Sequence, residues 1–122
     1  MTVRNVLLID DEEDFVTTLA ERLQLRGITA KTATDGELGL RLIKDETFQV
    51  VILDVLMPDL GGLEVLKQIK AFNPHIPVIL LTGHGDSQQS SRGIQLGAFD
   101  YLMKPFDIDE LIKKIEEAIH GQ

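Results

Sequence analysis

Four short apolar runs in this chain each end on a polar side chain that can take part in chemistry. Runs of branched apolar residues without alternation are typical of strands buried on both faces, as in a parallel sheet covered by helices. The carboxyl ends of parallel strands lie on one edge of the sheet, where ligands bind. We therefore expect one site at that edge. The runs are residues 6–9, 50–53, 78–81 and 101–103, and the residues that follow them are Asp10 and Asp11, Asp54, Thr82 and Lys104.

Segments with a helical period separate these runs. Phe15, Leu19 and Leu23 recur every four residues and predict a helix that ends before Gly27. Residues 28–33 are more polar than the other strands, which favours an edge position. Leu-rich stripes predict the remaining helices. Asp107 and Glu110 have the spacing of a capping box at the start of the last helix, although the usual first residue of such a box is Ser or Thr. The order is a strand followed by a helix, repeated five times.

The helix expected over residues 87–96 differs from the others. It offers no apolar side chain before Ile94, so only Ile94, Leu96 and Ala98 are available to face a core. Helices gain most of their stability by packing an apolar face. The sequence therefore predicts a weakly anchored helix, which fits either a switching element or a plain polar surface helix.

Composition limits the class of protein. The 122 residues fit one domain with a substantial core. The net charge of −8 makes direct nucleic-acid binding by this domain improbable, and the absence of cysteine rules out disulfide and thiol chemistry. The apolar run at residues 6–9 is too short for a signal-peptide core or a membrane span. We expect a cytoplasmic domain without a membrane partner.

The acidic residues at the expected edge suit a divalent cation. Residues 12–14 (Glu-Glu-Asp) are explained by the preference for acids at a helix start. Asp10 and Asp11 stand earlier, at the strand end, where they can approach Asp54. Crowded carboxylates repel one another unless they are protonated or bridged by a cation, and hard oxygen ligands favour Mg²⁺.

Asp54 is the candidate reacting group. A carboxylate can attack phosphorus to give an acyl phosphate, and catalysis of phosphoryl transfer consists mostly of positioning and charge neutralisation. We expect Mg²⁺, the Lys104 ammonium and the Thr82 hydroxyl each to take one phosphoryl oxygen. Taken singly, Asp54 could instead cap a loop, Lys104 could be a solvated charge and Thr82 could cap a helix. The Lys104–Pro105 bond is a candidate cis peptide.

With these motifs in place, the chain closely resembles the receiver domain of bacterial two-component response regulators over residues 1–122. The resemblance rests on the whole set of motifs in order, rather than on any one of them. The motifs are residues 9–11 (Ile-Asp-Asp), residues 53–54 with 57–59 (Met-Pro-Asp) and 61–62 (Gly-Gly), residues 81–83 (Leu-Thr-Gly) and residues 98–106 (Ala-Phe-Asp-Tyr-Leu-Met-Lys-Pro-Phe).

The resemblance implies an α/β, flavodoxin-like, doubly wound five-stranded parallel sheet of order 2-1-3-4-5 with five helices. It implies that Asp54 is the phosphoacceptor, that Thr82 and Tyr101 are switch residues, and that Lys104 binds the phosphoryl group. The implied Mg²⁺ ligands are Asp10, Asp11 (the more direct of the pair), Asp54 and the backbone carbonyl of Leu56.

The family also implies partners and a mode of output. Phosphorylation by a sensor histidine kinase or phosphotransfer protein would switch the face formed by the fourth helix, fifth strand and fifth helix. That face would then control an output domain or effector protein, or form a homodimer. The domain is not an enzyme in its own right, although it assists its own phosphorylation and dephosphorylation. By family position, Leu56 and His84 influence the lifetime of the phosphoryl group, and apolar Leu56 predicts slow hydrolysis.

Three rival classes of protein fit the sequence less well. A haloacid-dehalogenase-type phosphatase carries a second aspartate two residues after its nucleophile, and here that position is Leu56. A flavodoxin or nucleotide-binding module would need a phosphate-cradling loop, and neither G-x-G-x-x-G nor a P-loop sequence is present. A degenerate receiver that only binds partners is disfavoured by intact Asp54, Thr82 and Lys104.

Overall fold

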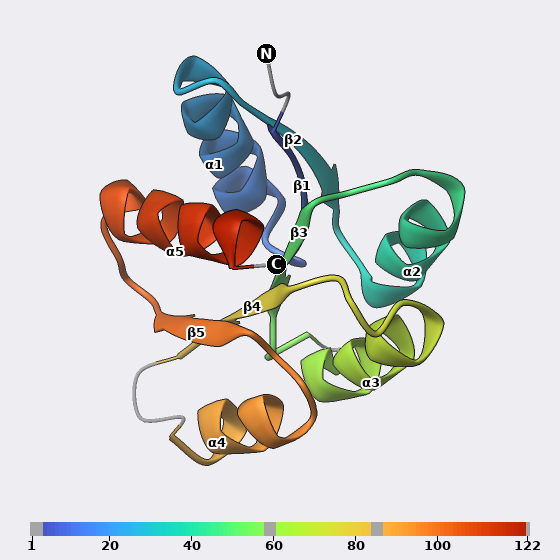
Figure 1. Ribbon diagram of the computed structural model, residues 1–122. Helices are drawn as coiled ribbons and strands as arrows, with labels where there is room; N and C mark the ends of the chain where they lie inside the picture. Colours follow the sequence, from blue (N-terminus) through green and yellow to red (C-terminus); the bar gives the residue numbers. More distant parts are fainter. Residues whose placement is uncertain (1–3, 58–60, 84–86, 122) are drawn as a thin grey trace.

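The centre of the molecule is a five-stranded parallel sheet (Figure 1). The computed structural model describes residues 4–57, 61–83 and 87–121. The strand order is β2-β1-β3-β4-β5, and every neighbouring pair is parallel. This confirms the predicted fold, including the edge position of the polar second strand. The strands are β1 (Arg4–Ile9), β2 (Ile28–Ala33), β3 (Val50–Asp54), β4 (Val78–Thr82) and β5 (Asp100–Met103).

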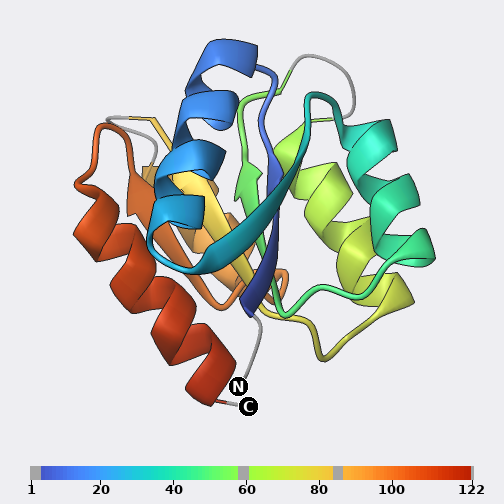
Figure 2. The same ribbon diagram turned by 90° about the horizontal axis from the view of Figure 1, so that it is seen from above.

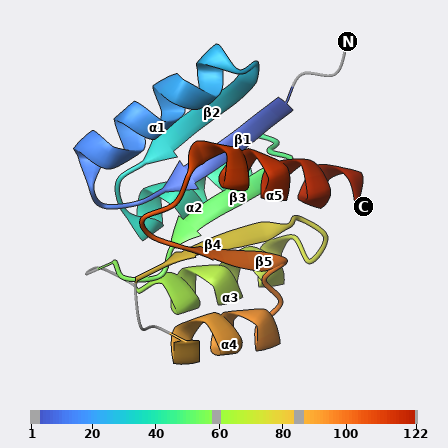
Figure 3. The ribbon, with the colours of Figure 1, turned by 90° about the vertical axis from the view of Figure 1, so that its left-hand side faces the viewer.

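The three inner strands are buried on both faces because helices cover both sides of the sheet. Figure 2 shows α1 and α5 on one side and α2 and α3 on the other, and Figure 3 shows α4 beyond α3 near β5. A strand's side chains alternate between the faces. Leu8 and Ile52 accordingly pack in the core under α1 and α5, whereas Leu7 and Leu53 pack in the core under α2 and α3.

The helices begin and end near the predicted boundaries. α1 buries the predicted stripe at Leu19 and Leu23, and α5 has the predicted capping box, in which Glu110 Oε1 accepts from the Asp107 amide at 3.2 Å. The Lys104–Pro105 peptide is cis, as expected. The helices are α1 (Glu13–Leu25), α2 (Gly36–Asp45), α3 (Gly62–Phe72), α4 (Ser87–Gln95) and α5 (Ile108–His120).

Helix α4 is anchored differently from the sequence prediction. Of the three apolar side chains available to face a core, Ala98, just after the helix, is buried and Leu96 packs against the core, whereas Ile94 is 43% exposed. The buried positions inside α4 are Ser90 and Gly93. A Cβ atom on Gly93 would lie 2.0 Å from Leu80 Cδ1. The helix therefore lies close against β4 by means of small residues rather than an apolar stripe.

Backbone hydrogen bonds stabilise the edge of the sheet at which the strands end. The Val55 amide donates to Leu81 O at 3.1 Å, and the Lys104 amide donates to Thr82 O at 2.8 Å, so β3, β4 and β5 stay paired as far as the residues of interest. At Gly62 an added Cβ would lie 2.2 Å from Val55 Cα, which requires glycine where α3 starts against β3. Among the described residues, no helix combines the length and the apolar character that crossing a membrane requires.

Candidate functional site

Side chains from three distant segments meet at this edge of the sheet. Lys104 Nζ, after β5, lies 2.8 Å from Asp10 Oδ2, after β1, and 3.8 Å from Asp54 Oδ2, at the end of β3. Asp10 is 1% exposed and Asp54 5% exposed, so both carboxyl groups lie inside the protein surface. The convergence of these residues, which the sequence predicted from the strand ends, is present.

The carboxyl group of Asp54 is held in an environment that disfavours its charge. Burial, the largest cause, together with the charges of Asp10 and Asp11, raises the pKa of Asp54 from 3.8 to about 6, against the lowering effects of the Leu56 amide and Lys104. The Leu56 amide donates to Asp54 Oδ1 at 3.1 Å and fixes the orientation of the carboxylate. At neutral pH the group is mainly ionised and is a candidate nucleophile.

The ammonium group of Lys104 is the positive charge of the site. Burial alone would lower the pKa of Lys104, but the hydrogen bond to Asp10 and the negative charges of Asp10 and Asp54 raise it above the usual value. A second hydrogen bond joins Lys104 Nζ to Glu12 Oε1 at 3.2 Å. Lys104 is therefore charged at neutral pH, and two of its three N–H donors are directed at carboxylates.

Glu12 is a further candidate site residue, for which the sequence indicates only a place at a helix start. Acids at the start of a helix are common for electrostatic reasons, and Glu12 was attributed to that preference. Its backbone amide donates to Asp10 Oδ1 at 3.0 Å, which orients the Asp10 carboxylate toward Lys104. No sequence signal separates Glu12 from Glu13, because the distinguishing contact is made with a residue near the other end of the chain.

The hydroxyl group of Thr82 is also buried at this edge. Thr82 is 1% exposed, and its Oγ1 has no hydrogen-bond partner among the residues that the structure describes. A buried polar atom without a partner carries a free-energy cost and is often explained by a ligand or a water. Thr82 is the residue next to Leu81, whose backbone pairs with the segment following Asp54.

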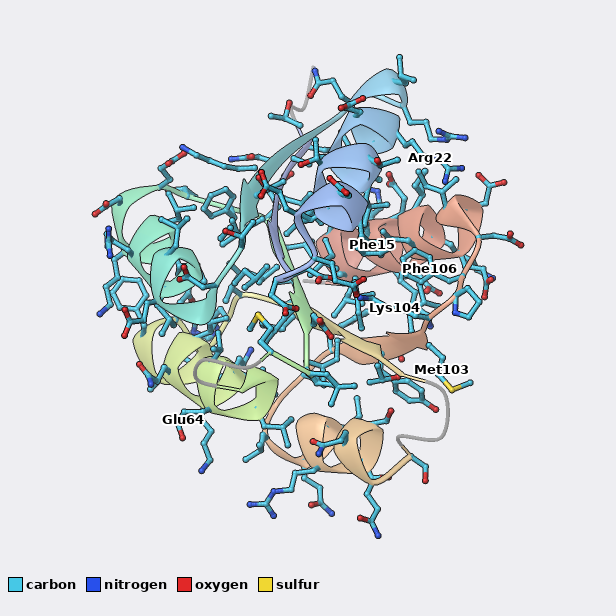
Figure 4. The ribbon with its side chains drawn as sticks, turned by 180° about the vertical axis from the view of Figure 1, so that it is seen from behind. Phe15, Arg22, Glu64, Met103, Lys104 and Phe106 are labelled. Atoms are coloured by element: carbon cyan, nitrogen blue, oxygen red, sulfur yellow. The ribbon has the colours of Figure 1, made fainter. Side chains whose placement is uncertain are left out.

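An aromatic pair borders the lysine (Figure 4). Lys104 Nζ lies 4.3 Å from the centroid of the Phe15 ring, and the Phe15 and Phe106 rings meet edge to face with centroids 6.2 Å apart. Phe15 belongs to the first turn of α1, and Phe106 lies between β5 and α5. From the sequence alone, Phe15 is predicted only as part of the core-facing stripe of its helix.

The other predicted site residues are placed as follows. Asp11 is exposed and contributes its charge to the raised pKa of Asp54. Leu56 has an exposed side chain, 55% accessible. Tyr101 is 40% exposed, whereas the next residue of β5, Leu102, is buried, in keeping with the alternation of side chains along a strand. The motif positions Pro58 and Asp59 and the candidate lifetime residue His84 lie outside the described residues.

The donor set at this edge suits one hard cation. Carboxylate oxygens of Asp10, Glu12 and Asp54, hereafter the acid cluster, lie within 4.8 Å of one another. Oxygen-only ligands of this kind suit Mg²⁺, which retains several waters. Lys104 contacts the same three carboxylates, so the acid cluster already attracts one positive charge. The described grouping includes Glu12, whereas the sequence suggested Asp11.

Comparison with known proteins assigns the class. Residues 6–116 match the family described as the response regulator receiver domain. The chain therefore belongs to the response-regulator receiver family, whose members are signalling domains of two-component systems.

Particular relatives support this assignment. The chain is 40% identical over 114 residues to the DNA-binding transcriptional regulator NtrC of Escherichia coli (strain K12), covering 93% of this chain and 24% of that protein. It is 32% identical over 120 residues to the regulatory protein AtoC of the same organism, covering 98% of this chain and 26% of that protein. The chain thus spans about a quarter of the length of these curated relatives.

Solved structures agree in fold. A response regulator receiver domain protein from Clostridium thermocellum superposes with a TM-score of 0.93 at 37% identity, covering 97% of this chain and 95% of that one. The receiver domain of NtrX from Brucella abortus gives a TM-score of 0.90 at 34% identity, covering 96% and 99%. The predicted family and the predicted fold are both confirmed.

Proposed function

We propose that this domain receives a phosphoryl group on Asp54, in a reaction that requires Mg²⁺, and that the modification switches an output surface. The observation that carries the proposal is the position of the Asp54 carboxylate, which lies at the carboxyl edge of the sheet, 3.8 Å from the Lys104 ammonium. This carboxylate is buried, and burial with the nearby carboxylates raises its pKa. We propose that residues 1–122 form one such domain.

In the proposed transfer, an Asp54 carboxylate oxygen attacks the phosphorus of a phosphohistidine or of a small acyl phosphate. The new O–P bond forms as the N–P or O–P bond of the donor breaks, and the electron pair leaves with the imidazole or the carboxylate of the donor. Asp54 Oδ1 accepts from the Leu56 amide. Since that bond orients the group, Oδ2, on the side of Lys104, is the attacking oxygen.

Lys104 and Thr82 complete the proposed reaction site. The third N–H donor of Lys104 makes no hydrogen bond to the described residues, so it is available for an oxygen of a phosphoryl group on Asp54. The Thr82 hydroxyl, without a hydrogen-bond partner among the described residues, is available for another. The ammonium would neutralise, and the hydroxyl would stabilise by a hydrogen bond, the charge that develops on the equatorial phosphoryl oxygens during transfer.

We assign the metal to the carboxyl edge of the sheet. Asp10 and Asp54, with Asp11 or Glu12 and the Leu56 carbonyl, would hold Mg²⁺ by oxygen ligands alone. When bound, the ion would neutralise one phosphoryl oxygen and relieve the repulsion among the carboxylates.

The proposed switch couples Thr82 to the face formed by α4, β5 and α5. A Thr82 hydroxyl drawn toward the phosphoryl group vacates space behind β4, and half-exposed Tyr101 can then move inward. Helix α4 contacts the sheet through Ser90 and Gly93 rather than through large apolar side chains, so moving it costs little packing energy. Such coupling shifts a population between two states.

The proposed partners follow from the family. The donor is a sensor histidine kinase or a phosphotransfer protein in the cytoplasm, and the switched face contacts an output domain, an effector protein or a second copy. The relative NtrC is by name a DNA-binding transcriptional regulator, and this chain matches about a quarter of it. The acidic domain itself is not proposed to bind nucleic acid.

Incubation with a small acyl phosphate and Mg²⁺, followed by intact mass measurement, tests the proposal. Wild-type protein should gain the mass of one phosphoryl group, and omission of Mg²⁺ should abolish the gain. Asp54→Asn keeps the acceptor for the Leu56 amide but lacks the nucleophile, so it should gain nothing. An unchanged mass gain in Asp54→Asn would place the acceptor elsewhere.

A further inference from the structure

Lys104 has a neighbour that the phosphoryl-transfer scheme does not use. On one side its ammonium faces the acid cluster, and on another it lies over the Phe15 ring, 4.3 Å from the centroid. An ammonium over an aromatic face is attracted by the ring quadrupole, and the attraction grows as the pair is desolvated. The Lys104 side chain is only 21% exposed, so this contact is partly shielded from water.

The Phe15 ring is itself held in place. The edge of one ring meets the face of the other in the Phe15–Phe106 pair, at an interplanar angle of 88°. Phe106 follows Lys104 by two residues, so the segment that carries the lysine also carries the ring that packs against Phe15. Figure 4 shows the three side chains together where α1 approaches the segment between β5 and α5, with Met103 directed away.

Each ring of this pair packs against the core under α1 and α5 with part of its surface. Both rings are only partly buried. They border a groove of about 410 Å³, whose wall also includes Leu19, Pro105 and Ile108. Core packing therefore uses only part of each ring, and one face of the Phe15 ring is left for the Lys104 ammonium.

We propose that Phe15 is a positioning residue for Lys104: its ring, fixed by Phe106, holds the ammonium at the distance from Asp54 at which it can take a phosphoryl oxygen. This inference rests on the proposed function. A lysine side chain is a flexible four-carbon stem with much rotamer freedom to lose. Asp10 and Glu12 also hold the ammonium, but as hydrogen-bonded carboxylates they draw it toward themselves. The Phe15 ring restricts the position of the ammonium without forming an ion pair with it.

The test separates ring electrostatics from ring shape. Phe15 is replaced by 4-fluoro-, 3,5-difluoro- and 3,4,5-trifluorophenylalanine, which weaken the negative face of the ring stepwise with little change in size. The rate of Asp54 phosphorylation by a small acyl phosphate at saturating Mg²⁺ should fall in steps along the series. Phe15→Leu should lose about three- to tenfold in rate, the range expected for a partly shielded cation–π contact, and Phe15→Tyr should recover most of it. Phe72→Leu, at an exposed phenylalanine far from the site, is the matched control.

A second readout does not depend on phosphorylation. The ring current of Phe15 should shift the Lys104 Hε protons upfield in the proton NMR spectrum of the wild type, and Phe15→Leu should abolish that shift. Equal rates across the fluorinated series, or an unshifted Lys104 signal in the wild type, would overturn the positioning role. If the wild type takes up no phosphoryl group while the Lys104 signal is shifted, the proposed function fails and the positioning role fails with it, although the contact stands.

Discussion

The buried carboxyl group of Asp54 imposes a cost on folding that can be measured directly. In the unfolded chain it titrates at an ordinary value near 3.8, whereas the folded protein raises its pKa to about 6. Because the folded pKa is the higher one, the stability associated with this group is fully present below about pH 4 and is lost as the pH rises through about 6. A difference of about two pKa units corresponds to about 3 kcal/mol, at about 1.4 kcal/mol for each unit.

Asp54→Asn removes this charge and retains the side-chain oxygen that accepts from the Leu56 amide. In a chelator, the free energy of unfolding of the Asn variant should exceed that of the wild type by up to about 3 kcal/mol above pH 7, and the excess should vanish near pH 4. The attraction of Lys104, 3.8 Å away, already lowers the folded pKa and is therefore included in this difference.

Urea unfolding from pH 4 to pH 8 measures this difference. Asp45→Asn is the control, because Asp45 is an exposed carboxylate at the end of α2; its effect should stay within about 0.5 kcal/mol at every pH. An Asp54→Asn variant that is less stable than the wild type at pH 7.5 would refute the reasoning, since it would mean that the ionised carboxylate is well compensated in the folded protein.

Other consequences of the structure can be checked separately. Mg²⁺ should raise the melting temperature of the wild type by binding only the folded acid cluster, and Asp54→Asn should reduce that increase; no increase in the wild type would contradict the metal assignment. Leu56→Asn should speed hydrolysis of the phosphorylated form, because an amide can orient an attacking water and a leucine cannot; slower hydrolysis would count against this. Phosphorylation should change amide-exchange protection most within residues 83–106, and Thr82→Ala should weaken that response; changes confined to the metal loops would show that the switch uses another surface. Gly93→Ala should destabilise the protein by about 1 kcal/mol, because the overlap of its methyl group with buried Leu80 outweighs the gain in helix propensity; unchanged stability in urea would mean that the Leu80 side chain takes another rotamer without cost.

The parts of the fold that sequence predicted are those in which local pattern and burial coincide. The unbroken apolar runs of β1, β3 and β4 are typical of strands covered on both faces, and the more polar pattern of β2 favours an edge. Helix α4 shows the limit of this reasoning. It is anchored by Ser90 and Gly93, and small residues that allow close approach to β4 carry no hydrophobic signal.

The site divides in the same way. The positions of Asp10, Asp54, Thr82 and Lys104 were predictable because each stands directly after an apolar run, and the strand ends of a parallel sheet share one edge. Glu12 and Phe15 were not, because each had a sufficient local explanation as a helix-start acid or a core-facing aromatic. Only the three-dimensional arrangement brings Lys104 into contact with both.

Chemical trapping of the phosphorylated residue tests the central claim most directly. After reaction with a small acyl phosphate and Mg²⁺, borohydride reduces an aspartyl phosphate to homoserine, and peptide sequencing by mass spectrometry locates the converted residue. We predict homoserine at position 54 and at no other carboxylate. Conversion at Asp10 or Asp11, with Asp54 intact, would contradict it.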